Sequence, residues 1–305
     1  MTLNNYLCHN STWLTFIFSL RNMCDTPRYT VSSSQVVRDT LPRRLLRSLL
    51  CMHPNDREGD ALRRACRKNA DATSVSIEND ADIESAAISE ALTLFQNLEE
   101  LEVKGGALKS SPRVKKLSLI DVDIQDCELV EGLSDLTLKG IVTTTPRLAS
   151  FVLSPLNRNT LTYLALTDVL HVTDESLNDI VDGLPGLREI VLVNLSRLTA
   201  TGIRKALELS LVERVTLKDL QIDNLEPSTF PLCLSYLHLR SIHTTDYVSK
   251  VLTDPLSLRE LILDGTNVKE CQLEWDILVL ENLQLLRIKN NHKLSAYGFD
   301  KRQRA

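Results

Sequence analysis

The sequence predicts an α/β solenoid in which short parallel strands stack into one curved sheet, with helices or turns on the outer side. The first indication is a spacing, apolar-x-x-apolar-x-apolar, that recurs at least ten times from Leu98 onward. The second is the period, because from Leu161 the frames begin at residues 161, 187, 212, 234, 258 and 283, in steps of 26, 25, 22, 24 and 25 residues. One such unit cannot bury its apolar face alone, so neighbouring units must stack and share a continuous core.

The strand frames are clearest in the second half of the chain. The last two apolar residues of each frame are separated by one residue, so both point to the same face of a strand and into the core. This spacing and period resemble leucine-rich repeats, each a short strand followed by a helix or turn. The clearest frames are Leu161-x-x-Leu164-x-Leu166, Leu187-x-x-Ile190-x-Leu192, Leu234-x-x-Leu237-x-Leu239 and Leu258-x-x-Leu261-x-Leu263.

The first part of the repeat region is less regular. Ala72-x-x-Val75-x-Ile77 predicts a degenerate first strand, followed by a helix over residues 83–95. The next frames begin at residues 98, 114, 133, 148 and 161, in steps of 16, 19, 15 and 13 residues, which are too short for a full outer helix. Loops or a single 3₁₀ turn are therefore expected there, and Leu148-x-x-Phe151-x-Leu153 is expected to be a weak strand.

Threonines follow the later strands at the position where an outer helix begins. Thr173, Thr199 and Thr244 or Thr245 are placed to accept hydrogen bonds from the first N–H groups of these helices. The order of strand, apolar residue, threonine and helix resembles the ribonuclease-inhibitor-like type of leucine-rich repeat. The cysteine usual in that type is replaced here by apolar residues that should pack equally well, namely Val169, Leu195, Leu220 and Ile242.

The exposed side of the predicted sheet is the candidate binding surface. Side chains that alternate with the buried ones point to the concave face, and solenoid curvature turns them into an extended surface. Aromatic and arginine residues dominate interface energetics, so Tyr163, Tyr236 and Arg240 are the best anchors. The alternative is a solvated sheet face. The candidate client-binding residues are Tyr163, Glu189, Arg214, Tyr236, His238, Arg240 and Glu260.

Residues 1–70 carry no regular repeat and are expected to form a small helical region before the solenoid of residues 71–305. Pro42 suits the first turn of a helix, and the leucines between Leu41 and Leu50 fall on one helical face. Asp60 can cap a second helix over residues 61–68.

Two short patterns in this region resemble the two halves of a VHL-type box. Residues 19–24 have the form Ser-Leu-x-x-x-Cys, and residues 41–49 have Leu-Pro followed by leucines. Together with the repeats, they are similar to the Zyg-eleven/Zer-one family of cullin-two substrate receptors. The resemblance implies a non-catalytic subunit of a cullin-RING E3 ubiquitin ligase, which binds elongin C and cullin-two through its first helices and a client protein through its repeats. The adaptor-binding residues that it implies are Leu20, Cys24, Leu41, Pro42, Leu45 and Leu49.

The same region allows other interpretations. Residues 41–68 also resemble an F-box, whose helices bind the Skp adaptor of cullin-one ligases, although Lys68 and Asn69 stand where that motif usually has a tryptophan. The basic helices can instead form a cap over the apolar end of the solenoid. A plain repeat scaffold with no ligase link is a further alternative.

Composition argues against several other classes of function. The net charge of -5 over 305 residues gives no reason to expect a nucleic-acid partner. The apolar stretch from Trp13 to Leu20 is far short of the ~20 residues that span a bilayer, so no membrane association is expected. Seven cysteines without a C-x-x-C pair predict reduced thiols in a cytoplasmic or nuclear protein. The sequence shows no catalytic, metal-binding or phosphate-binding motif, so neither an enzyme nor a cofactor is expected.

Overall fold

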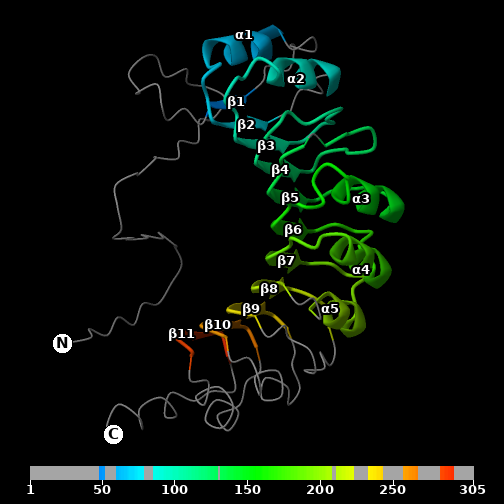
Figure 1. Cartoon of the computed structure of the whole chain (residues 1–305), viewed down its shortest axis with the longest axis vertical. Helices are drawn as coiled ribbons and strands as arrows, with labels where there is room; N and C mark the ends of the chain where they lie inside the picture. Colours follow the sequence, from blue (N-terminus) through cyan, green and yellow to red (C-terminus); the bar gives the residue numbers. More distant parts are fainter. Residues whose placement is uncertain are drawn as a thin grey trace, which may run out of the picture.

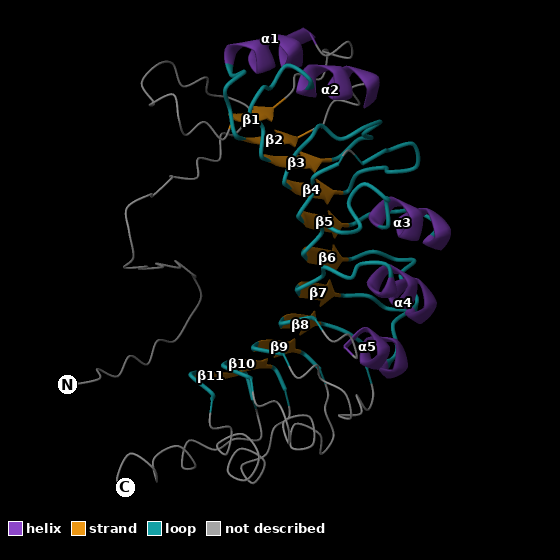
Figure 2. Ribbon diagram, viewed as in Figure 1, coloured by secondary structure: helices purple, strands orange, loops and turns teal. Residues whose placement is uncertain are grey.

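The chain is a curved solenoid built on a single parallel sheet. The computed structural model describes residues 48–51, 60–78, 85–129, 131–207, 211–222, 233–242, 257–266 and 282–291. Within these residues, eleven strands form one sheet in which every strand lies beside the next one along the chain. Figures 1 and 2 show the strands on the inner side of a crescent and the helices on its outer side. The predicted leucine-rich-repeat fold is therefore confirmed.

The strands are short and similar in length, as the recurring frames predict. They are β1 Ser48–Cys51, β2 Ser74–Glu78, β3 Glu100–Lys104, β4 Lys116–Ile120, β5 Asp135–Lys139, β6 Tyr163–Thr167, β7 Glu189–Val193, β8 Arg214–Lys218, β9 Tyr236–Arg240, β10 Glu260–Asp264 and β11 Leu285–Lys289. The described helices are α1 Asp60–Lys68, α2 Ser85–Leu92, α3 Thr145–Val152, α4 Asp174–Asp182 and α5 Ala200–Leu207. None of these helices is long and apolar enough to cross a bilayer.

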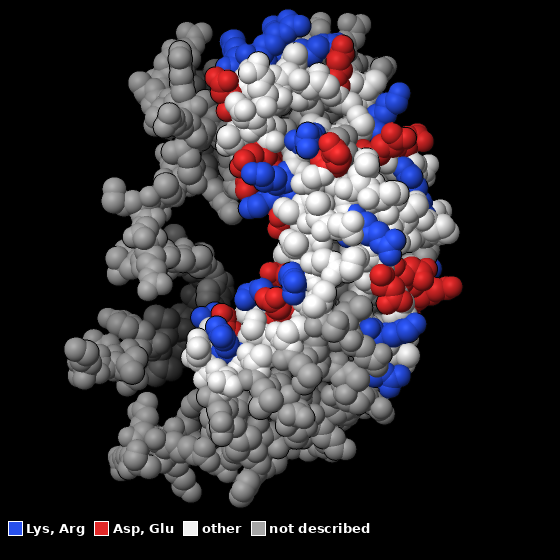
Figure 3. Space-filling view, viewed as in Figure 1, with Lys and Arg blue, Asp and Glu red and all other residues white. Residues whose placement is uncertain are grey.

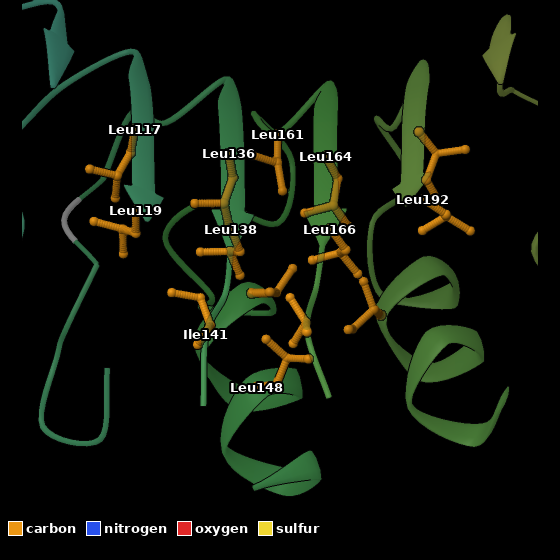
Figure 4. Close-up of a cluster of buried hydrophobic side chains, with 14 of the residues drawn as sticks. Leu117, Leu119, Leu136, Leu138, Ile141, Leu148, Leu161, Leu164, Leu166 and Leu192 are labelled. Carbon is orange, nitrogen blue, oxygen red and sulfur yellow. The ribbon is translucent and has the colours of Figure 1, made fainter. Parts of the chain in front are cut away.

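The core runs along the inside of the stack. Leu164 and Ile190 are fully buried, and Figure 4 shows Leu136 and Leu138 of β5 beside Leu164 and Leu166 of β6. The four apolar residues predicted to replace the usual cysteine are buried as well: Val169, Leu195, Leu220 and Ile242. The apolar residues of each repeat therefore form one layer of the core, and this layer packs against those of the neighbouring repeats.

One predicted strand is wrong. The frame that begins at Leu148 lies in helix α3, where Leu148, Phe151 and Val152 are buried at helical spacing. Pro146 sits in the first turn, where its missing N–H has no partner within the helix in any case. The interval from residue 133 to residue 161 is thus one full repeat with an outer helix. The loop predicted after β3 is confirmed, because residues 105–115 contain no helix.

The first strand corrects a second expectation. The helix predicted from Leu41 does not continue through residues 48–51, which form β1 and pair in parallel with β2 from Ser48↔Val75 to Cys51↔Glu78. A short apolar run fits a strand as well as a helix, and pairing satisfies the backbone groups at the edge of β2.

Helix α1 confirms the second predicted helix. Its Leu62 and Cys66 are buried in the solenoid core, so this part of residues 1–70 continues the solenoid.

Threonine capping is confirmed where it can be seen. The side chain of Thr173 accepts a hydrogen bond from the backbone N–H of Ser176, in a capping box at the start of α4. The hydroxyl oxygen of Thr199 accepts from the N–H of Thr201 at 3.2 Å in α5. Asp174 links the two helices, because its carboxylate accepts a 2.8 Å hydrogen bond from the N–H of Thr199. Thr244 and Thr245 lie outside the described residues.

The buried leucines set the stability of the stack. We expect Leu164→Ala to lower the free energy of unfolding by about 2–5 kcal/mol, because the cavity lies between packed strands and cannot close completely. Leu170→Ala is the matched control, since that side chain is 56% exposed just beyond the same strand. Urea denaturation of both variants measures the difference. Equal losses would show that Leu164 is not part of a packed core.

Candidate functional site

The concave face of the sheet is made of three parallel rows of side chains. From β2 to β10, each strand buries its second and fourth residues in the core, so its first, third and fifth residues point to the inner side of the crescent. In β11 the corresponding Leu286 and Ile288 are only partly buried. We call these positions the first, second and third rows. Because all the described strands pair in continuous register, each row crosses the sheet at right angles to the strands.

The structure brings the predicted client-binding residues together on this face. Five of them are consecutive register partners in the first row, one from each strand between β6 and β10. His238 lies in the second row and Arg240 in the third row of β9. The first-row residues are Tyr163, Glu189, Arg214, Tyr236 and Glu260.

Arg214 is held at the centre of the first row. Its Nε lies 3.3 Å from Oε2 of Glu189, and its guanidinium carbon lies 4.0 Å from the centroid of the Tyr236 ring. The side chain of Arg214 remains 40% exposed. An ion pair on one side and a cation–π contact on the other restrict the rotamers of this side chain. A partner that binds Arg214 therefore meets a side chain that is already ordered.

Tyr163 is a neutral hydrogen-bonding group at neutral pH. Burial raises the pKa of its phenol above the usual value, and the negative charges of Glu189 and Asp135 raise it further, while a hydrogen bond with Thr137 lowers it. The ring is half-buried, so it offers a partner both apolar surface and a hydroxyl group.

His238 is also neutral at neutral pH. Burial lowers the pKa of its imidazole to about 4, and the cations Lys218, Arg240 and Lys289 add to this effect, while Asp264 opposes it. In the described part of the chain, the buried Nε2 of His238 has no hydrogen-bond partner. The described residues also contain no group of three or more His, Cys, Asp or Glu residues that could hold a metal ion.

The predicted adaptor-binding residues cannot be placed on this surface. Leu49 lies in β1. The others, Leu20, Cys24, Leu41, Pro42 and Leu45, lie outside the described residues.

The structure also shows two exposed apolar residues that the sequence interpretation did not single out. Val142 and Leu170 are 64% and 56% exposed, and each follows the buried residue that comes after a strand, β5 and β6 respectively. They occupy equivalent positions of neighbouring repeats, at the edge where the strands end. The available signal was an extra apolar residue directly after Ile141 and Val169.

The neutral state of His238 gives the fold a pH dependence. The folded pKa of about 4 lies below the ordinary value of 6.5, so the unfolded chain binds the proton more readily. This contribution to stability is present above pH 6.5 and is lost as the pH falls toward 4. We expect His238→Gln to reduce the loss in unfolding free energy between pH 7 and pH 5 by on the order of 1 kcal/mol.

Chemical denaturation at the two pH values measures this effect. His171→Gln is the matched control, because it removes a histidine from the loop after β6 rather than from the concave face. An unchanged pH dependence in His238→Gln would contradict a buried, neutral imidazole.

Comparison with known proteins adds little beyond the fold. No protein-family model matches the sequence, and no curated protein matches it either. A crystal structure of a TLR13–ssRNA13 complex matches at 11% sequence identity with a TM-score of 0.42, over 74% of this chain and 48% of that chain. The chain thus spans about half the length of that protein. An internalin, inlF, from Listeria monocytogenes matches at 12% identity with a TM-score of 0.36, over 80% of this chain and 91% of that chain.

The geometry of the described residues assigns the fold. From β2 to β10 each strand buries one apolar pair, and from Leu161 the frames follow at a period near 25 residues. The strands pair in parallel in chain order, and helices or loops return the chain on the outer side. These features are those of a leucine-rich-repeat fold.

Proposed function

We propose that this protein is a non-catalytic interaction scaffold whose concave sheet face binds a partner protein. The first row between β6 and β10 is the centre of the proposed contact. It combines two tyrosines, an arginine and two glutamates in adjacent register positions. Tyrosine and arginine are the residue types that carry most of the binding energy in protein interfaces.

The observation that carries this proposal is the arrangement around Arg214. A long charged side chain normally loses rotamer freedom when a partner binds it, which costs about 0.5–1.5 kcal/mol. Arg214 has lost much of that freedom already, because Glu189 and the Tyr236 ring hold it from two sides. Its remaining exposed surface is therefore available for binding at a lower entropic cost.

The size of the face supports the proposal as well. Neighbouring strands lie ~4.8 Å apart, so the five strands from β6 to β10 span roughly 19 Å and all eleven span roughly 48 Å. An interface of standard size uses about 20–30 residues on each side. The concave positions of this sheet are numerous enough for such a contact.

A double substitution in the first row tests this function. We expect Arg214→Ala with Tyr236→Ala to weaken binding of the principal captured protein about 30-fold or more, because a hot spot contributes about 2 kcal/mol or more and these two contacting side chains act as one. The measurement is affinity capture with the full chain, followed by a binding constant for the purified captured protein.

Arg188→Ala is the matched control. Arg188 is a comparably exposed arginine paired with Glu213 at 3.2 Å, but it lies just before β7 and outside the three rows. Capture that survives the double substitution would show that the concave face is not the binding surface.

A link to a cullin-RING ligase is the more specific form of this function that the sequence resemblance suggests. In this form, residues 1–70 bind elongin C and cullin-two, or the Skp adaptor and cullin-one, and the concave face holds the client. Its support comes from the sequence patterns around Leu20, Cys24 and Leu41 alone. The burial of Leu62 and Cys66 of α1 in the core favours the alternative, in which this region caps the solenoid.

Co-purification with elongin C, with the Skp adaptor or with neither distinguishes these forms. We expect Leu41→Ala with Pro42→Ala to abolish capture of the ligase adaptor, because it removes the Leu-Pro start of the implied helix. The thermal unfolding midpoint should stay unchanged. Unchanged adaptor capture by this variant would refute the motif, and capture of neither adaptor by the original chain would refute the ligase link.

A further inference from the structure

The second row of the concave face is uncharged over seven consecutive strands. Between β4 and β10, each strand contributes a hydroxyl-bearing, aliphatic or neutral imidazole side chain at its third position. We call this set the uncharged strip. It consists of Ser118, Thr137, Ala165, Val191, Thr216, His238 and Ile262. Figure 3 shows groups of charged residues along the inner side of the crescent with uncharged surface between them.

The strip lies between the first and third rows of the concave face. Six strand-to-strand steps of ~4.8 Å give a length of roughly 29 Å. The first and third rows form its two sides and are four residues apart along each strand, which is about 13 Å. Most of the strip consists of small side chains. Ala165 and Thr216 are almost fully covered by their neighbours, so a partner reaches the strip mainly at its other five members.

The two rows beside the strip carry opposite net charge. Over the same strands, the first row has Asp135, Glu189 and Glu260 against Lys116 and Arg214. The third row has Lys139, Lys218 and Arg240 against Asp264.

Most of these charges already have partners on the protein. Arg214 pairs with Glu189, Lys116 pairs with Glu100, and Arg240 lies 3.8 Å from Asp219. Lys139 and Lys218 form no ion pair with any other described residue. Two cations on one side of an uncharged strip thus remain available to an acidic group.

The curvature of the sheet decides which kind of segment fits. The strip follows the inner arc of the crescent in Figure 1, so a straight helix laid along it would touch the arc near its ends and leave a gap in the middle. An extended chain can bend along the arc. At ~3.3 Å per residue, about nine extended residues cover the strip.

We propose that the uncharged strip binds an extended, acidic peptide segment of the partner protein, with small or aliphatic side chains against the strip and carboxylates beside Lys139 and Lys218. The uncharged strip allows the segment to bury apolar surface without leaving a buried charge unpaired. The proposal rests on the proposed function, since it specifies what part of the partner lies on the concave face.

A random twelve-residue peptide display library, selected on the full chain, provides the probe. We expect the enriched peptides to contain carboxylates among small and aliphatic residues. Val191→Glu should weaken their binding at least about tenfold, because it places a negative charge in the middle of the strip that repels the peptide carboxylates. Lys218→Glu should have a similar effect through repulsion of the peptide carboxylates. Fluorescence anisotropy with a synthetic labelled peptide measures both effects.

The controls use the same substitutions elsewhere. Val142→Glu changes an exposed valine beyond the end of β5, and Lys205→Glu reverses an exposed lysine of α5 on the outer side. Both should leave the peptide Kd within about twofold, and all four variants should keep the original thermal unfolding midpoint.

The proposal is overturned if no enriched peptide loses affinity for Val191→Glu, or if NMR of the bound labelled peptide gives the carbonyl carbon shifts of a helix. These outcomes are distinguishable from failure of the proposed function. If the Arg214→Ala, Tyr236→Ala variant loses its captured protein while no peptide responds to Val191→Glu, the face binds a folded surface and the peptide proposal is wrong.

Discussion

The structure depends on one constraint, which is that the second and fourth side chains of each strand from β2 to β10 are buried against the same positions of the neighbouring strands and beneath the outer helices and loops. Leu164 and Ile190, for example, are fully buried although they belong to repeats 26 residues apart. A slip of one residue in any strand would turn its core pair toward solvent. Register is therefore fixed across the whole sheet, and the concave rows are straight as a direct consequence.

The same constraint explains how the strands end. The residue after a strand must leave the sheet while its N–H still donates to the next strand, as Asp168 does to the carbonyl of Val193 at 3.0 Å. This geometry requires a positive φ, which glycine, asparagine and aspartate tolerate best. Gly140 has a φ of 63° and Asn194 a φ of 50° at this position. Because these residues end the strands at the same height in the sheet, the fifth residues of neighbouring strands lie side by side and the third row is straight.

The sequence predicted the repeats correctly because a buried strand face leaves a clear spacing of apolar residues. It failed to predict the elements whose apolar spacing fits both a strand and a helix. The Leu148 frame and the run that contains Leu49 fit both a strand and a helix, and only the neighbouring elements decide between them. On the concave face, alternation alone predicted that Tyr163, Arg214 and Tyr236 face outward. Their contacts depend on register between separate repeats and on rotamers, as does the low pKa of His238, whose cationic neighbours come from three strands. No local pattern contains that information.

Fixed register also separates the fold from most of the concave face. Because the core positions and the backbone pairing maintain the stack, exposed residues in the three rows can differ without altering the backbone that carries them. Ala165 and Thr216 of the second row are the exceptions, because they are buried. In this chain, Glu189 and Arg214 compensate each other within the first row, which lowers the desolvation penalty for covering either of them. Lys139 and Lys218 are not compensated in this way, and both lie on one side of the uncharged strip. Under the proposed function, a partner that neutralises them would gain more than one that covers only the paired charges. The third row, rather than the tyrosines and arginine of the first row, would then distinguish an acidic partner from a neutral one.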